Sequence, residues 1–185
     1  MDKVGTEAAY RRYLDGDDSA FDEIQRTYFM PLTFYAARIV HDTDAAQDIA
    51  IEALLQLIIH KKRYRFGSSL QAYLYKIAHN KSVNYIKRNA HETIISEDMS
   101  KDRAEDENTL EEQLISEERM RAVSRAVNTL PAEMAEAIHL FYYADFSYEE
   151  IAKTMKKTRK QIDNLLYRAK SALRNILGEE GDLDD

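Results

Sequence analysis

The stretch SYEEIAKTMKKTRKQIDNLLYRAKSALR, residues 147–174, decides the fold. Ser147 and Glu150 have the S-x-x-E spacing of a capping box, the pattern that begins a helix. Apolar residues then recur every three or four positions, and Thr158 offers a cap for a second, longer amphipathic helix. Ala152 is small enough to let the two helices approach where they cross. The stretch therefore predicts a helix-turn-helix.

The outer face of the second predicted helix carries side chains that suit DNA. Arginine, lysine and asparagine can reach base edges and phosphates from a helix lying in the major groove. The capping pattern alone would equally fit a helical hairpin with a solvated outer face. The two caps, the apolar stripe and the basic face together favour DNA binding. The predicted outer face consists of Arg159, Lys160, Asp163, Asn164, Tyr167 and Ser171.

The turn between these helices holds Lys156 where such turns usually hold glycine. A positive φ angle costs a residue with a Cβ atom about 1 kcal/mol. We therefore expect the turn to use another geometry.

Composition excludes several classes of protein. The chain has 185 residues, no cysteine, five glycines and two prolines. Few turn residues argue against a sandwich or barrel, and the lack of cysteine excludes disulfides and thiolate metal sites. The five histidines are scattered and no catalytic motif is present, so we expect no enzyme, metal or cofactor. No window is long and apolar enough for a membrane helix, and the first residues lack a signal-peptide core, so we expect a cytoplasmic protein without membrane insertion.

Charge is segregated along the chain, although the net charge is −7. Residues 61–88 hold eight basic residues and no acidic one, and residues 147–177 hold eight basic and three acidic ones. Residues 92–118 hold eleven acidic residues and two basic ones. A duplex responds to local basic faces rather than to the mean charge, so the net charge does not exclude nucleic acid.

Residues 63–88, RYRFGSSLQAYLYKIAHNKSVNYIKR, form a second candidate interface. Aromatic rings among basic side chains suit unpaired strands, because rings stack on bases and cations follow the backbone. Alternatively, the tyrosines belong to the core and the basic residues to a solvated face; for Tyr73 and Tyr85 both interpretations stay open. The aromatic residues of the segment are Tyr64, Phe66, Tyr73, Tyr75 and Tyr85.

Apolar spacing predicts helices over nearly the whole chain. His139 lies among apolar neighbours and is expected to be a core histidine. Helices are predicted over residues 6–14, 18–40, 44–60, 69–86, 131–144, 147–155 and 158–177, with a further helical pattern around 110–127.

Three segments resemble the extracytoplasmic-function group (group IV) of the bacterial sigma-70 family. They are AAQDIAIEALLQL (45–57), SLQAYLYKIAHNKSVNYIKR (69–88), and LPAEMAEAIHLFYYADFSYEEIAKTM (130–155) with QIDNLLYRAKSALR (161–174). All three in this order and at this spacing are highly specific. The chain departs from the family's frequent residues at Ile51 (Gln), Tyr73 (Trp), His79 (Arg) and Asn84 (Asp).

The resemblance implies an all-α fold of two small helical domains. Residues 1–89 would form a region 2-like bundle of three to four helices, and residues 114–178 a region 4-like helix-turn-helix domain. An acidic flexible linker over 90–113 would join them, and 179–185 would be an acidic tail.

The resemblance also implies an RNA polymerase sigma factor, which binds core RNA polymerase and directs initiation by recognising −35 duplex and melted −10 DNA. An anti-sigma factor is a further expected partner. The implied core-polymerase contacts are Ala46, Asp48, Glu52 and Leu54. The implied −10 contacts are Arg65, Phe66, Gly67, Ser68, Tyr73, Lys76, Asn80, Lys81 and Asn84. The implied −35 contacts are Arg159, Lys160, Asn164, Tyr167 and Arg168.

Two alternatives stay open. A stand-alone helix-turn-helix regulator on duplex operator DNA explains the C-terminal half but leaves the aromatic–basic segment unused. The second alternative, a helical interaction protein without a DNA role, leaves both basic segments unexplained.

Overall fold

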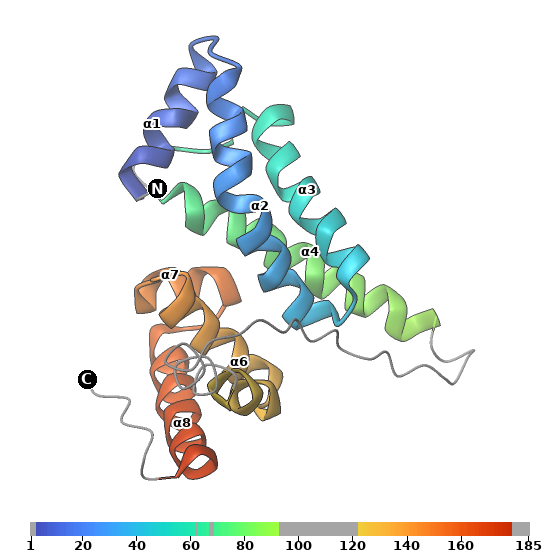
Figure 1. The fold of residues 1–185 in the computed structure, drawn as a ribbon, viewed down its shortest axis with the longest axis vertical. Coiled ribbons are helices and arrows are strands. Elements are labelled where there is room, and N and C mark those ends of the chain that lie inside the picture. The colour runs from blue at the N-terminus through green and yellow to red at the C-terminus, as the bar shows by residue number, and fades with distance from the viewer. Residues whose placement is uncertain (1–2, 62, 67–68, 93–121, 179–185) are drawn as a thin grey trace, which may run out of the picture.

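The computed structural model describes residues 3–61, 63–66, 69–92 and 122–178, and all regular structure in these ranges is helical (Figure 1). The all-α prediction is confirmed. One unit consists of α1 (Lys3–Leu14), α2 (Ser19–Val40), α3 (Thr43–Ile59) and α4 (Leu70–Glu92). The other holds a helical segment over 122–129, α6 (Ala132–Ile138), a π-helical turn (His139–Tyr143), α7 (Tyr148–Met155) and α8 (Arg159–Leu177).

Little of the predicted linker is described. Helix α4 continues to Glu92, through the first three residues assigned to the linker, and the tail lies outside the described residues. Within the described ranges, none of the helices combines the length and the apolar character that crossing a bilayer requires.

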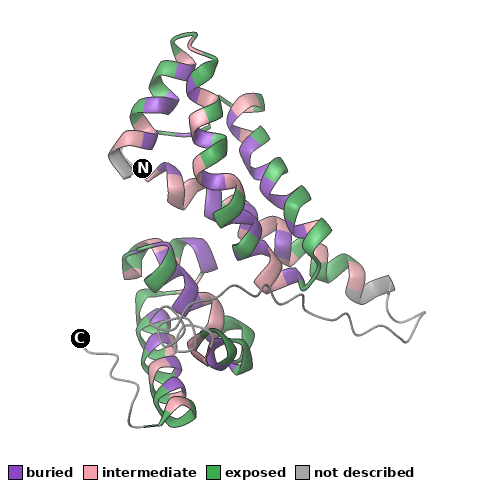
Figure 2. Cartoon of the chain, in the orientation of Figure 1, coloured by how far each residue is buried: buried purple, intermediate pink, exposed green. Residues whose placement is uncertain are grey.

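Helix α2 is the centre of the first unit and contacts α1, α3 and α4. Its buried side chains, including Ile24, Leu32 and Tyr35, recur at helical spacing as the sequence predicts. Phe21 and Ile39, also predicted on this face, pack against the core while partly exposed. Figure 2 shows these buried stripes turned toward one another on the helices of this unit.

Polar caps set the corners between these helices. His41 ends α2 in the left-handed conformation at φ 55°, and the next residue, Asp42, accepts the amides of Asp44 and Ala45 at 3.0 and 3.1 Å. A sharp α2–α3 corner results. The predicted cap of α4 is confirmed, since the Ser69 hydroxyl accepts the Ala72 amide at 3.3 Å.

His139 is buried, with 7% of its surface exposed, which confirms its placement in the core. Its ring stacks on Tyr143 at 5.3 Å between centroids and lies 5.7 Å from Tyr35. Burial first, and the charge of Arg38 second, lower the pKa of His139 to about 4. The sequence did not reveal that the helix switches to π winding at this residue, where Ala144 donates to His139 O at 3.2 Å.

The depressed pKa of His139 predicts acid sensitivity. A histidine in the unfolded chain has a pKa near 6.5, so between about pH 6.5 and pH 4 the unfolded state binds more protons. The free energy of unfolding should fall by roughly 3 kcal/mol over this window because of His139 alone. Denaturant titrations at pH 7.5 and pH 4.5 should show that His139→Asn loses much of this fall in the free energy of unfolding. His41→Asn, at an exposed position, is the control. An equal fall in the two variants would contradict the assignment of the acid sensitivity to His139.

Candidate nucleic-acid interface

Two capping boxes begin the helices of the helix-turn-helix. The Glu150 amide donates to Ser147 Oγ at 3.3 Å, and the Glu150 carboxylate accepts the Ser147 amide at 2.9 Å. Thr158 and Gln161 repeat the arrangement at 3.3 and 2.7 Å. Both predicted caps are therefore confirmed, and α7 and α8 start directly after them.

The expectation that Lys156 avoids a positive φ is wrong. Lys156 lies in the left-handed region at φ 55° and ψ 42°. Its amide and that of Lys157, the latter at 2.9 Å, both donate to the carbonyl of Ala152. These hydrogen bonds close the end of α7 and offset the strain that the Cβ atom of Lys156 introduces.

The inner faces of α7 and α8 pack as predicted, and the buried residues include Ile151, Met155, Ile162, Leu166, Ala169 and Leu173. This packing leaves the opposite side of α8 in solvent. Arg159, Lys160, Asn164, Tyr167 and Arg168 are all exposed there.

Two details of the exposed face bear on DNA binding. Tyr167 is 75% exposed, so its ring is available to a partner. Arg159 lies 3.2 Å from Glu149, but both side chains are more than half exposed. Such a pair contributes less than about 1 kcal/mol, so Arg159 can exchange it for a phosphate at little cost.

Helix α4 presents only some of its predicted −10 residues. Lys76 and Asn84 are exposed. Lys81 pairs with Glu52 of α3, so the two side chains neutralise each other. Asn80 is partly buried, and its Oδ1 atom is buried without a hydrogen-bond partner. The exposed part of this face is therefore narrower than the sequence suggests.

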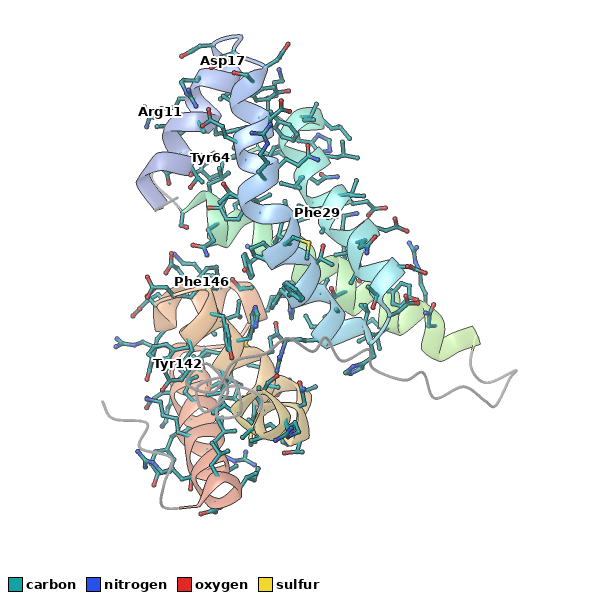
Figure 3. The ribbon with its side chains drawn as sticks, viewed as in Figure 1. Arg11, Asp17, Phe29, Tyr64, Tyr142 and Phe146 are labelled. Atoms are coloured by element: carbon teal, nitrogen blue, oxygen red, sulfur yellow. The ribbon has the colours of Figure 1, made fainter. Side chains whose placement is uncertain are left out.

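The segment before α4 joins an aromatic cluster. Phe66 is 39% exposed, and its ring lies 5.3 Å from that of Tyr64 and 4.3 Å from the guanidinium of Arg11 on α1. Figure 3 labels Arg11 and Tyr64 beside each other at this end of the unit. Arg65 is exposed, whereas Gly67 and Ser68 lie outside the described residues. Arg11 was not among the predicted site residues, because its place beside Phe66 depends on the packing of α1.

The tyrosines of this region divide between core and surface. Tyr64 and Tyr75 are 5% and 2% exposed, so for these two the core interpretation is the right one. Tyr73 and Tyr85 are partly exposed. Tyr85 donates to Asp42 at 2.9 Å, and the Tyr73 ring packs edge-on against Tyr64.

On α3, the predicted polymerase contacts need revision. Asp48 and Glu52 are exposed, but Ala46 and Leu54 are 0% and 4% exposed. Both side chains face inward because they continue the buried stripe of α3 that packs against α2. They therefore hold α3 in place and leave its outer side to other residues.

The sequence reasoning missed an exposed apolar stripe on the outer side of α3. Ile51, Leu55 and Ile59 lie one turn apart and are 45%, 41% and 63% exposed. Their spacing of four residues is the signal that could have found them. The family resemblance singles out Ile51 only as a departure from a frequent glutamine.

The geometry defines an all-helical protein with a helix-turn-helix and a second basic helix. Family models match in the same order: "Sigma-70 region 2" over residues 25–92 and "Sigma-70, region 4" over residues 120–173. Together they cover more than half of the chain. The chain therefore belongs to the sigma-70 family, and it is an RNA polymerase sigma factor of the extracytoplasmic-function type.

Relatives of similar length support this assignment. RNA polymerase sigma-H factor of Pseudomonas aeruginosa is 28% identical over 88% of both chains. ECF RNA polymerase sigma-E factor of Escherichia coli is 28% identical over 89% of this chain and 90% of the relative.

Solved structures share the fold. The sigma factor RpoE, in complex with the anti-sigma factor NepR from Bartonella quintana, matches with a TM-score of 0.66 and 21% identity, over 85% of this chain and 96% of that one. CnrH, in complex with the cytosolic domain of CnrY, matches with a TM-score of 0.61 and 16% identity, over 97% and 99%.

The turn geometry predicts a stabilising substitution. Lys156→Gly should raise the free energy of unfolding by up to about 1 kcal/mol, because glycine adopts a positive φ without a Cβ clash. Denaturant titration measures the change. Lys153→Gly, three residues earlier inside α7, is the control and should destabilise by a similar amount. A loss of stability in Lys156→Gly would contradict the account of the turn.

Proposed function

We propose that the two units of this sigma factor divide promoter recognition, with α8 reading the −35 duplex and the α4 region holding the melted −10 strand. The observation that carries the proposal is α8: a basic helix begun by a capping box, buried on one side and exposed on the other. Its exposed side chains can reach base edges and phosphates from the major groove.

In the −10 interaction, the protein captures bases and breaks no covalent bond. Opening a duplex costs roughly 1.4 kcal/mol of stacking per base step. Stacking of an unpaired base on an aromatic side chain returns roughly 1–3 kcal/mol. Phe66 offers such a ring, and Arg65, Lys76 and Asn84 offer exposed polar groups along the strand. Asn80, Lys81, Tyr73, Gly67 and Ser68 remain proposed contacts. Core polymerase must supply the rest of the free energy.

The outer face of α3 is the proposed surface for core RNA polymerase. Its apolar stripe, Ile51, Leu55 and Ile59, lies beside the exposed Asp48 and beside Glu52, whose carboxylate pairs with Lys81 of α4. A partner that fits this face would present apolar side chains flanked by basic ones. Core RNA polymerase, the partner that the family resemblance implies, is proposed to present such a surface. The buried centre of an interface carries most of its binding energy and is depleted in charged residues, so we expect the stripe to contribute more binding energy than the acids.

We also propose an anti-sigma factor as a partner, on the strength of the RpoE neighbour, which was solved with one. A cytoplasmic location follows from the proposed polymerase partner. No catalytic activity is proposed.

Run-off transcription tests the function. Core RNA polymerase from the source organism is incubated with sheared genomic DNA, with and without the protein, and transcript starts are sequenced. We expect starts that require the protein and share two upstream motifs at fixed spacing. If no new starts appear while a control sigma factor is active, the stand-alone operator-binding regulator becomes the better explanation.

The α3 surface predicts a separable defect. The double variant Ile51→Ser, Leu55→Ser should weaken binding to core polymerase at least about tenfold, because two exposed apolar anchors are lost. Binding is measured by fluorescence anisotropy of labelled protein, with circular dichroism as a check on folding. Ile176→Ser on α8, where the side chain is 51% exposed, is the matched control. Equal affinities for the double variant and the control would rule out this surface.

A further inference from the structure

Buried contacts fix helix α1 to α3 and to the residues ahead of α4. The Tyr10 hydroxyl on α1 donates to the carbonyl of Leu57, in the last turn of α3, at 3.1 Å. The Tyr64 hydroxyl donates to the Glu7 carboxylate on α1 at 2.9 Å. Tyr10 and Tyr64 are 0% and 5% exposed, and their ring centroids lie 5.6 Å apart in an edge-to-face arrangement. The position of α1 beside this end of the unit is therefore set by the core.

These contacts place a cation of α1 on the ring that is proposed to stack on an unpaired base. The guanidinium of Arg11 lies 4.3 Å from the centroid of the Phe66 ring, and both side chains are exposed. An aromatic face attracts a guanidinium and holds it without using its N–H donors. Those donors therefore remain available to a ligand that approaches the exposed side of Phe66.

The surrounding charges distinguish Arg11 from the next residue, Arg12. The guanidinium of Arg12 lies 2.6 Å from Glu23 and 3.8 Å from Asp17, so two carboxylates already neutralise it. Within the described part of the chain, no carboxylate lies at ion-pair distance from Arg11, whose side chain contacts the Phe66 ring. Of two adjacent exposed arginines, Arg11 is therefore the one that can accept an anion without breaking an ion pair.

The ligand that fits this arrangement is a nucleotide of an unpaired strand. An exposed aromatic ring stacks on a base, and a guanidinium beside the ring can bind the adjoining phosphate through two N–H groups. Lys61 and Arg63, both exposed on the segment that follows α3, add positive potential for a strand backbone. A paired duplex offers phosphates but no unstacked base, so the ring and the guanidinium together favour a melted strand.

We propose that Arg11 of α1 is a further contact of the −10 strand, binding the phosphate of the nucleotide whose base stacks on Phe66. The inference rests on the proposed role of Phe66 in holding the melted strand. It extends the interface to a helix outside the region 2 match, which begins at residue 25. Because the guanidinium rests on the ring, Arg11 also holds Phe66 in place for the base.

The salt dependence of binding tests this contact. Each phosphate contact to a single strand contributes about 0.7 to the slope of log K against log salt concentration. The full-length protein is titrated into a short fluorescein-labelled single strand of mixed sequence, and anisotropy is measured from low to physiological salt. Arg11→Ala should reduce the magnitude of the slope by about 0.7 and weaken binding several-fold at low salt. Arg11→Lys retains the charge and should retain the slope.

Arg12→Ala is the matched control. It removes an exposed arginine from the same turn of α1, but one whose charge Glu23 and Asp17 already neutralise, so the slope should stay unchanged. Circular dichroism checks the folding of each variant. An unchanged slope in Arg11→Ala, or a slope in Arg11→Lys as low as that of Arg11→Ala, would overturn the proposal. So would an unmodified protein that fails to bind the single strand at low salt.

A double-mutant cycle tests whether the contact lies at Phe66. If the phosphate and the base belong to one nucleotide, Arg11→Ala and Phe66→Leu should have non-additive effects on strand affinity. Lys160→Ala on α8 should be additive with Arg11→Ala, and additivity in both pairs would overturn the placement. These titrations contain neither polymerase nor promoter. Their outcome is therefore separate from a failure of the proposed function, which run-off transcription reports.

Discussion

A tyrosine hydroxyl that is removed from water must find a hydrogen-bond partner, and Tyr35 finds it on the other unit of the chain. Its ring belongs to the core of the first unit, on the central helix α2, so the hydroxyl cannot turn toward solvent without disturbing that core. Burial and the neighbouring Glu136 raise its pKa, which keeps the hydroxyl protonated and donating. One side chain thereby joins the core of the first unit to the second unit.

Packing of the two units leaves much of the proposed working surface uncovered. Lys76 and Asn84 on α4, the basic face of α8, and the apolar stripe of α3 are all exposed. Each surface is therefore accessible to its proposed partner. Two DNA contacts on one chain are linked, and linked contacts bind far more tightly than separate ones when the geometry lets both engage.

The sequence predicted the features that are local. Both capping boxes, the buried stripes of α2, α7 and α8, and the basic outer face of α8 follow from spacings of three and four residues, which the helix itself imposes. The sequence did not predict features that depend on tertiary packing. Two pairs of apolar residues on α3, Ala46 with Leu54 and Ile51 with Leu55, cannot be told apart in the sequence. Only the position of α2 determines which pair is buried. The left-handed conformation of Lys156 was not predicted, because the steric cost of a positive φ argues against it. Two hydrogen bonds, which the sequence does not reveal, offset that cost. The pairing of Tyr35 with Glu136 joins residues 101 positions apart and leaves no local pattern.

The central claim is that α8 reads the −35 duplex while the α4 region holds the melted −10 strand. Run-off transcription with core RNA polymerase can compare Arg168→Ala on α8 with Phe66→Ala before α4, on a promoter whose −10 segment is fully paired and on the same promoter with that segment held open by mismatches. The account predicts that the mismatched template rescues initiation by Phe66→Ala, because no base step then has to be unstacked, and leaves the defect of Arg168→Ala in place. Equal rescue of the two variants would contradict it.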